Sequence, residues 1–122
     1  MKIMLVSPRA DELGDFLSGL KLKEHEPVLA GSGREALELI LSTRPVLVIV
    51  DDVLEDFDAL GLVLEILRKD ATVNTAVITS QPEETFEEKS EGLGILARIA
   101  DQPDALDAEE LMRKLSRVAQ SG

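Results

Sequence analysis

Short apolar runs alternate along the chain with longer segments whose apolar residues recur at the period of an α-helix. The runs are candidate strands, and they cover residues 2–6, 27–30, 46–50, 76–79 and 96–100. Strands that alternate with helical segments are typical of a parallel sheet joined by crossover helices. The run from Val46 to Val50 is apolar at every position, which predicts a central strand covered on both faces. The pattern therefore predicts a repeated βα architecture.

The first and last helical segments each carry one apolar face. In the first segment this face consists of Leu13, Phe16, Leu17 and Leu20, and in the last of Leu111, Leu115, Val118 and Ala119. A helix with one apolar face buries that face against another layer. Both helices are therefore expected to pack on the sheet.

Three places carry the residue pattern that begins a helix. Ser7 precedes a proline, which is favoured at the first helical position. Ser32 is followed by Glu35, and Asp107 by Glu110, each pair at the spacing of a capping box. Helices are expected to begin directly after Ser7, Ser32 and Asp107.

The third helical segment is apolar on more sides than one sheet can cover. One face consists of Ala59, Leu62, Val63 and Ile66, and a second strip of Leu60, Leu64 and Leu67. The first face is expected to lie against the sheet. The second strip is then either an interaction patch, for a partner or a second copy of the chain, or is covered by a neighbouring helix.

Composition narrows the class of protein. With 122 residues and aromatic side chains limited to three Phe, the chain is expected to form one domain, residues 1–122, with an aliphatic core. No cysteine is present, so disulfides and thiolate chemistry are excluded. No apolar run approaches the length that crosses a bilayer. A net charge of −11 with scattered Lys and Arg argues against binding nucleic acid or an anionic membrane. A cytoplasmic location is expected.

Two features that could mark a site have simpler interpretations. Gly31-Ser32-Gly33 could bind phosphate at a helix N-terminus, but it lacks the Lys of a nucleotide loop, so an ordinary turn and cap is favoured. His25 is the only histidine and stands among charged residues. It is expected in a surface loop, without a role as a metal ligand or in a catalytic triad.

Carboxylates follow the central strand candidate directly. Asp51 and Asp52 end the apolar run. In an open parallel sheet the carboxyl ends of the strands form the edge where ligands and reactive groups collect. A solvated acidic loop would explain this segment equally well if it stood alone.

The order of motifs along the whole chain resembles the receiver domains of bacterial two-component response regulators. In that family an aspartate closes the third strand and an Asp-Gly-Leu begins the third helix. Asp51, Leu54, Asp58 and Leu60 stand at the matching places, with Glu55 and Ala59 where the family usually has Pro and Gly.

Three further segments extend the resemblance. Residues 33–37 match the Gly-x-Glu-Ala-Leu that begins the second helix of receivers, and residues 77–80 match the fourth strand. Thr79 then stands at the hydroxyl position that binds the phosphoryl group, and Gln102-Pro103 stands at the family's Lys-Pro. The resemblance implies a flavodoxin-like (βα)5 doubly wound fold, a five-stranded parallel sheet in the order 2-1-3-4-5 with helices on both faces. It also implies Asp51 at the phosphoacceptor position and a cis bond before Pro103.

The departures from the family concern the phosphorylation chemistry itself. Ser7 and Pro8 occupy the positions of the acidic pair that holds Mg²⁺, and neutral Gln102 replaces the lysine. Ile99 replaces the aromatic switch residue. Asp52 is a neighbouring acid, but consecutive strand side chains face opposite ways. Arg9 could supply a substitute cation or could be solvated on the first helix.

The resemblance and its departures favour a degenerate receiver, or pseudo-receiver, that acts through protein contact and is not an enzyme. The expected partner is a signalling protein, either a histidine kinase or an output domain, and a homodimer is possible. No metal and no cofactor are expected. The alternative is a working Mg²⁺-dependent receiver that a histidine kinase phosphorylates at Asp51. A small-molecule binder that uses the same strand edge is a third hypothesis.

Overall fold

The computed structural model describes residues 1–21 and 27–121, with the backbone alone for Lys21 and residues 119–121. Its five strands form one parallel sheet in the order β2-β1-β3-β4-β5. The strands are β1 (Ile3–Val6), β2 (Pro27–Ala30), β3 (Leu47–Asp51), β4 (Asn74–Thr79) and β5 (Ala97–Ala100). The predicted flavodoxin-like doubly wound fold is confirmed, and each strand lies within two residues of its predicted range.

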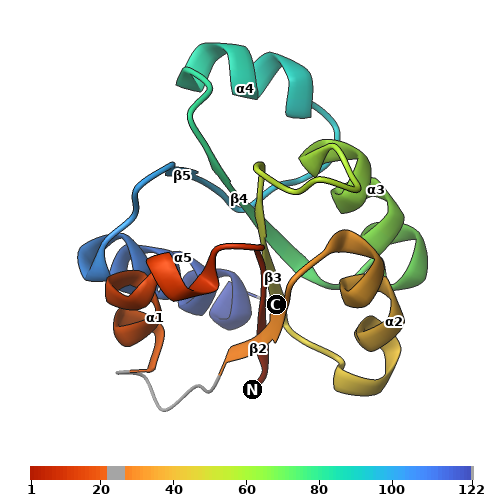
Figure 1. The fold of residues 1–122 in the computed structure, drawn as a ribbon, viewed down its shortest axis with the longest axis horizontal. Coiled ribbons are helices and arrows are strands. Elements are labelled where there is room, and N and C mark those ends of the chain that lie inside the picture. Colours follow the sequence, from red (N-terminus) through yellow and green to blue (C-terminus); the bar gives the residue numbers. More distant parts are fainter. Residues whose placement is uncertain (22–26, 122) are drawn as a thin grey trace.

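Helices cover both faces of this sheet (Figure 1). They are α1 (Gly14–Lys21), α2 (Gly33–Thr43), α3 (Ala59–Lys69), α4 (Glu83–Ser90) and α5 (Ala105–Ser121), and a 3₁₀ turn, η1 (Ala10–Glu12), precedes α1. Helices α1 and α5 pack on one face, and α2 and α3 on the other. None of these helices, within the part of the chain that is described, is long and apolar enough to cross a membrane.

Strand side chains alternate between the two faces and divide the core into two clusters. In β3, Leu47 and Ile49 join the residues of α1 and α5, whereas Val48 and Val50 join those of α2 and α3. All five residues of β3 are buried, as expected for a central strand. The predicted face of α1 packs on the first cluster, and so do Leu111 and Leu115 of α5. Val118, predicted for the same face, is 42% exposed and is not a buried residue of that cluster, and the side chain of Ala119 lies outside what the structure describes.

Helices α1 and α5 approach each other closely. A Cβ atom added to Gly19 would lie 2.7 Å from both the carbonyl oxygen of Ala105 and the Cβ of Ala108. These distances are shorter than van der Waals contact, so only glycine fits at this position. The absence of a side chain at Gly19 therefore sets how near the start of α5 comes to α1.

Only one of the three predicted helix starts is at the expected residue. Ser32 caps α2, with its Oγ accepting a hydrogen bond from the Glu35 amide at 3.1 Å. The prediction at Ser7 is wrong. Its Oγ accepts from the Arg9 amide at 3.1 Å in a tight turn, and α1 begins only at Gly14. Local hydrogen bonding by a serine hydroxyl competes here with helix initiation.

The start predicted for the last helix is three residues late. Asp104 and Asp107 cap each other's backbone amides, at 2.9 Å and 3.0 Å, so the box closes one turn earlier and α5 begins at Ala105. Aspartate at the third position replaces the Glu that the motif usually carries. A motif that requires Glu at the third position therefore selects Asp107 and Glu110, which is the wrong pair.

Helix α3 buries the predicted face but does not present the predicted patch. Ala59 and the three other residues of that face are buried. Leu60 and Leu67 are half-buried against the core, and only Leu64, 41% exposed, faces solvent. The expected strip is therefore mostly covered by its own surroundings.

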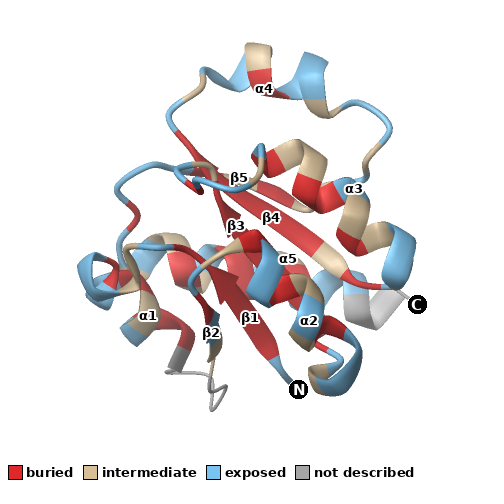
Figure 2. Ribbon diagram, turned by 45° about the vertical axis from the view of Figure 1, so that its right-hand side comes forward, coloured by how far each residue is buried: buried red, intermediate tan, exposed pale blue. Residues whose placement is uncertain are grey.

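Helix α4 occupies the place that the predicted βα repeat requires between β4 and β5, but the hydrophobic pattern did not identify its residues. Among its residues Phe86 alone is buried, and the helix is mostly exposed (Figure 2). Its low apolar content explains why the pattern did not reveal it. His25 lies outside the described residues, so its expected surface position stays a prediction.

Candidate functional site

Asp51 is the last residue of β3 and is completely buried. By strand alternation its side chain lies on the same face as Leu47 and Ile49, beneath α1 and α5. A carboxylate removed from water at this place needs hydrogen bonds or a cation to compensate its lost hydration. Its partners therefore decide what the site can do.

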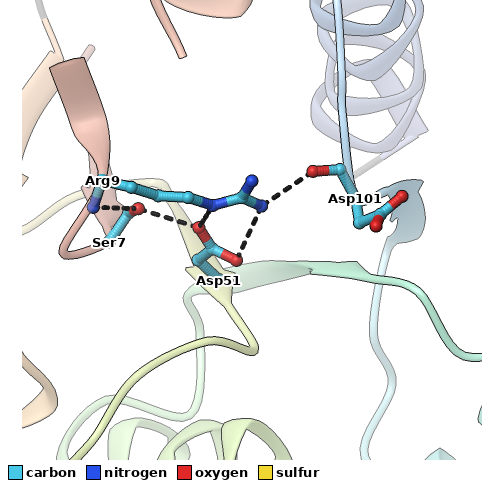
Figure 3. A network of polar contacts seen from close by, with 4 residues as sticks. All are labelled: Ser7, Arg9, Asp51 and Asp101. Carbon is cyan, nitrogen blue, oxygen red and sulfur yellow. Dashed lines mark hydrogen bonds and ion pairs between the residues drawn. The ribbon is translucent and has the colours of Figure 1, made fainter. Parts of the chain in front are cut away.

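Arg9 and Ser7 supply those partners (Figure 3). The Arg9 Nε donates to Asp51 Oδ2 at 2.8 Å, and its Nη2 donates to Oδ1 at 3.2 Å. The Ser7 hydroxyl donates to Oδ2 at 2.8 Å. Two parallel bonds from one guanidinium to one carboxylate are the strong, geometrically specific form of an ion pair. Both oxygens of Asp51 are thus engaged by groups of the chain itself.

The guanidinium remains charged in this arrangement. Its hydrogen bond to Asp51 raises the pKa of Arg9 above the ordinary value, against the opposing effect of burial. The Arg9 side chain is 21% exposed, while Asp51 is not exposed at all. The ion pair therefore contacts solvent only through the arginine side chain.

Arg9 also reaches the loop that follows β5. Its Nη2 donates to the carbonyl oxygen of Asp101 at 2.8 Å (Figure 3). One side chain thus joins the turn after β1, the end of β3 and the loop before α5.

Thr79 and Asp52 form a separate pair. The Thr79 hydroxyl donates to Asp52 Oδ2 at 2.5 Å and accepts from the Gln81 amide at 3.0 Å. In β4, Val77 packs in the cluster beneath α2 and α3, and alternation places Thr79 on that same side. Thr79 is therefore committed to Asp52 and makes no hydrogen bond with Asp51.

The loop at Gln102-Pro103 departs from the expectation. No cis peptide bond occurs in the described part of the chain, so the predicted cis bond before Pro103 is wrong. Gln102 is exposed, whereas Pro103 is buried. X-Pro bonds favour trans by about 0.5–1 kcal/mol. A glutamine that points to solvent offers the site no contact that would offset this preference.

The remaining predicted positions are distributed around this edge. Pro8 is exposed in the turn after β1, and Ile99 is buried in the core cluster beneath α1 and α5. Ile99 therefore contributes to core packing, and its side chain has no polar group that could form a hydrogen bond.

The residues present do not fit a magnesium ion. Mg²⁺ requires several oxygen ligands in octahedral array, usually with one or two carboxylates free to bind. Ser7 and Pro8 supply no carboxylate, and both oxygens of Asp51 are already bonded to Arg9 and Ser7. Within the described ranges no group of three or more His, Cys, Asp or Glu side chains could hold a metal.

Sequence reasoning identified Arg9 only as one of two alternatives and missed Asp101. Arg9 is the only basic residue between Ser7 and Leu20, directly beyond a buried strand. That isolation was a usable signal, because a buried strand-end aspartate needs a cation nearby. The Asp101 contact involves a backbone carbonyl, so no side-chain pattern could have revealed it.

A second acidic residue was also missed. Asp56, in the loop before α3, accepts hydrogen bonds from the amides of Gly33 at 3.0 Å and Arg34 at 2.9 Å. These two bonds lower the pKa of Asp56, with the bond from Arg34 the larger cause. Asp56 therefore caps the N-terminus of α2 from a distant part of the chain.

Comparison with known proteins gives a fold and no sequence family. No family model matches the chain, and no curated protein matches it. Among solved structures, a CheY-like response regulator receiver domain protein from Methanospirillum hungatei JF-1 is 20% identical, with a TM-score of 0.84 over 99% of this chain and 98% of that chain. The signal receiver domain of an HD domain-containing protein from Pseudomonas fluorescens Pf-5 gives the same four values.

A third structure agrees with these two. The REC domain of AraT, a response regulator from Geobacillus stearothermophilus, is 22% identical, with a TM-score of 0.82 over 98% of this chain and 96% of that chain. Sequence identities this low show that the folds are alike and do not show a shared function. The chain has the fold of response-regulator receiver domains.

Proposed function

We propose that this protein is a pseudo-receiver, a signalling domain that keeps the receiver fold and acts by protein contact without phosphorylation at Asp51. The observation that carries the proposal is the bidentate pair between Arg9 and the buried Asp51. It occupies the carboxylate that a phosphoryl group would have to reach.

Phosphoryl transfer to a carboxylate brings negative charge toward negative charge. Its rate depends on cations that are free to bridge the attacking and transferring oxygens. Here Arg9, the cation that contacts Asp51, is bound to the nucleophile itself. Freeing Asp51 would break three hydrogen bonds, two of them to a charged donor and worth about 1.5–3 kcal/mol each. Each 1.36 kcal/mol added to a barrier slows a reaction about tenfold.

The receiver fold supports the partners that we propose. Receiver domains transmit signals to other proteins, and the Pseudomonas structure is the receiver domain of an HD domain-containing protein. We place this domain in a two-component type pathway, where it contacts a histidine kinase or an output protein. In this proposal it needs neither Mg²⁺ nor another cofactor and catalyses no reaction.

The proposal is tested by titrating Mg²⁺, with and without beryllofluoride, while following the amide resonances of Asp51, Val53 and Thr79. We expect no saturable shift in the millimolar range. The matched control is a variant that restores the receiver residues and removes the arginine: Ser7→Asp, Pro8→Asp, Arg9→Ala and Gln102→Lys. Far-UV circular dichroism checks that this variant is folded. The folded variant should bind both Mg²⁺ and beryllofluoride. Saturable shifts in the unaltered protein that Asp51→Asn abolishes would establish the working phosphoacceptor instead.

A further inference from the structure

The Arg9 side chain contacts three segments that lie far apart in the sequence. It belongs to the turn after β1, and it binds Asp51 at the end of β3 and Asp101 after β5. The same nitrogen, Nη2, donates to both Asp51 Oδ1 and the Asp101 carbonyl. The position of this nitrogen relative to the loop therefore depends on the carboxylate that holds it.

The loop from Asp101 to Pro103 has little else to hold its backbone. Within the described residues, the bond from Arg9 is the one hydrogen bond made to the main chain of these three residues. Asp101 and Gln102 are both exposed, and only Pro103 is buried. Loops with exposed residues and few hydrogen bonds are the parts of a fold that open locally at low free energy.

This loop leads directly into α5. The reciprocal Asp104 and Asp107 cap begins one residue after Pro103. Helix α5 then lies against α1 at the Gly19 contact, where there is no room for even a methyl group. A change in the loop is therefore transmitted to a tightly packed helix start.

We propose that Arg9 is a positioning residue that couples the charged state of Asp51 to the conformation of the loop before α5. While Asp51 is charged, it holds the guanidinium in the orientation that bonds the Asp101 carbonyl. An event that neutralises or displaces the carboxylate releases the arginine, and the loop with the α5 N-terminus becomes free to move. The inference rests on the same Arg9–Asp51 pair as the proposed function, but it holds whether or not Asp51 accepts a phosphoryl group.

The test uses hydrogen exchange and carbonyl ¹³C shifts of the full chain. In Arg9→Ala and in Asp51→Asn, the amides of Asp104, Asp107 and Ala108, which are hydrogen-bonded at the start of α5, should exchange about tenfold faster, the effect expected when one charge-assisted hydrogen bond is lost. The Asp101 carbonyl resonance should move in both variants. Arg34→Ala is the matched control, because the Arg34–Glu38 pair is exposed, and it should change none of these signals.

Arg9→Lys separates coupling from a general loss of stability. A single ammonium can pair with Asp51 but lacks the planar fork that reaches a second acceptor at the same time. We expect the Asp51 signals to stay near those of the unaltered protein, while the Asp101 carbonyl shift and the exchange of the Asp104 amide change as in Arg9→Ala. Unchanged exchange at Asp104, Asp107 and Ala108 in Arg9→Ala, with a shifted Asp51, would overturn the coupling. That outcome would leave the proposed function intact, which is judged by ligand binding at Asp51.

Discussion

Replacing Arg9 by alanine should lower the free energy of unfolding far more than replacing an arginine of an exposed ion pair, such as Arg34 or Arg68. The change removes two charge-assisted hydrogen bonds from a carboxylate with no solvent exposure. Breaking a buried ion pair by removing one partner costs about 3–5 kcal/mol. Here the Ser7 hydroxyl stays bound to Asp51, and water can enter where the 21% exposed arginine was. We therefore expect a loss of about 2–3 kcal/mol, or about 6–12 °C in Tm.

The assay is urea denaturation followed by far-UV circular dichroism, since the chain has neither Trp nor Tyr for fluorescence. The single variants Arg9→Ala and Asp51→Ala and their double variant form a cycle, which should give a coupling energy of about 2 kcal/mol. Arg34→Ala is the control, because its pair with Glu38 is 3.7 Å long and strongly exposed, and it should stay within about 0.5 kcal/mol. A change of less than about 0.5 kcal/mol for Arg9→Ala, with no coupling to Asp51, would refute the reasoning.

Three further predictions concern the scaffold. Gly19→Ala should destabilise the domain by about 1–2 kcal/mol in the same assay, since its methyl group overlaps α5, whereas Gly61→Ala, whose nearest neighbour is 3.8 Å away, should be neutral or stabilising. Asp56→Ala should cost about 0.5–1 kcal/mol at neutral pH, after solvent screening of this exposed cap. Because the folded pKa of Asp56 lies below the unfolded value of 3.8, this difference should be present above that pH and disappear as the pH falls through the folded pKa; a difference that persists in acid contradicts it. Leu64→Lys should leave stability and sedimentation unchanged, while Leu67→Glu, half-buried against the core, should destabilise; a shift in association state with Leu64→Lys would restore the idea of an interface.

Much of the fold could be predicted from the sequence because its signals are local and repeated. The run ending at Val50 is apolar throughout, and this gave the central strand and the position of Asp51 at its end. The start of α5 was predicted three residues too late. Asp104 is the N-cap residue, and Asp107 is the residue that bonds back to the Asp104 amide. Helix α4, with Phe86 as its anchor, has too few apolar residues to show a period.

The candidate site was predicted by position and not by its interactions. The resemblance pointed to Asp51, Thr79 and Gln102, and the structure places Asp51 at the end of β3, Thr79 at the end of β4 and Gln102 after β5. It could not show that Thr79 binds Asp52, because that choice depends on which side of the sheet each side chain leaves the backbone. The role of Arg9 is a three-dimensional property of the turn after β1, where the Ser7 hydroxyl fixes the arginine amide.

The central claim is that the Arg9–Asp51 pair replaces phosphorylation at this strand edge. The most direct test is intact-protein mass spectrometry after incubation with acetyl phosphate and Mg²⁺, with the restored variant described above as a positive control. We predict that the unaltered protein keeps its mass while the restored variant gains a phosphoryl group that Asp51→Asn removes. A phosphoryl group on Asp51 of the unaltered protein, at an occupancy similar to that of the restored variant, would contradict the account.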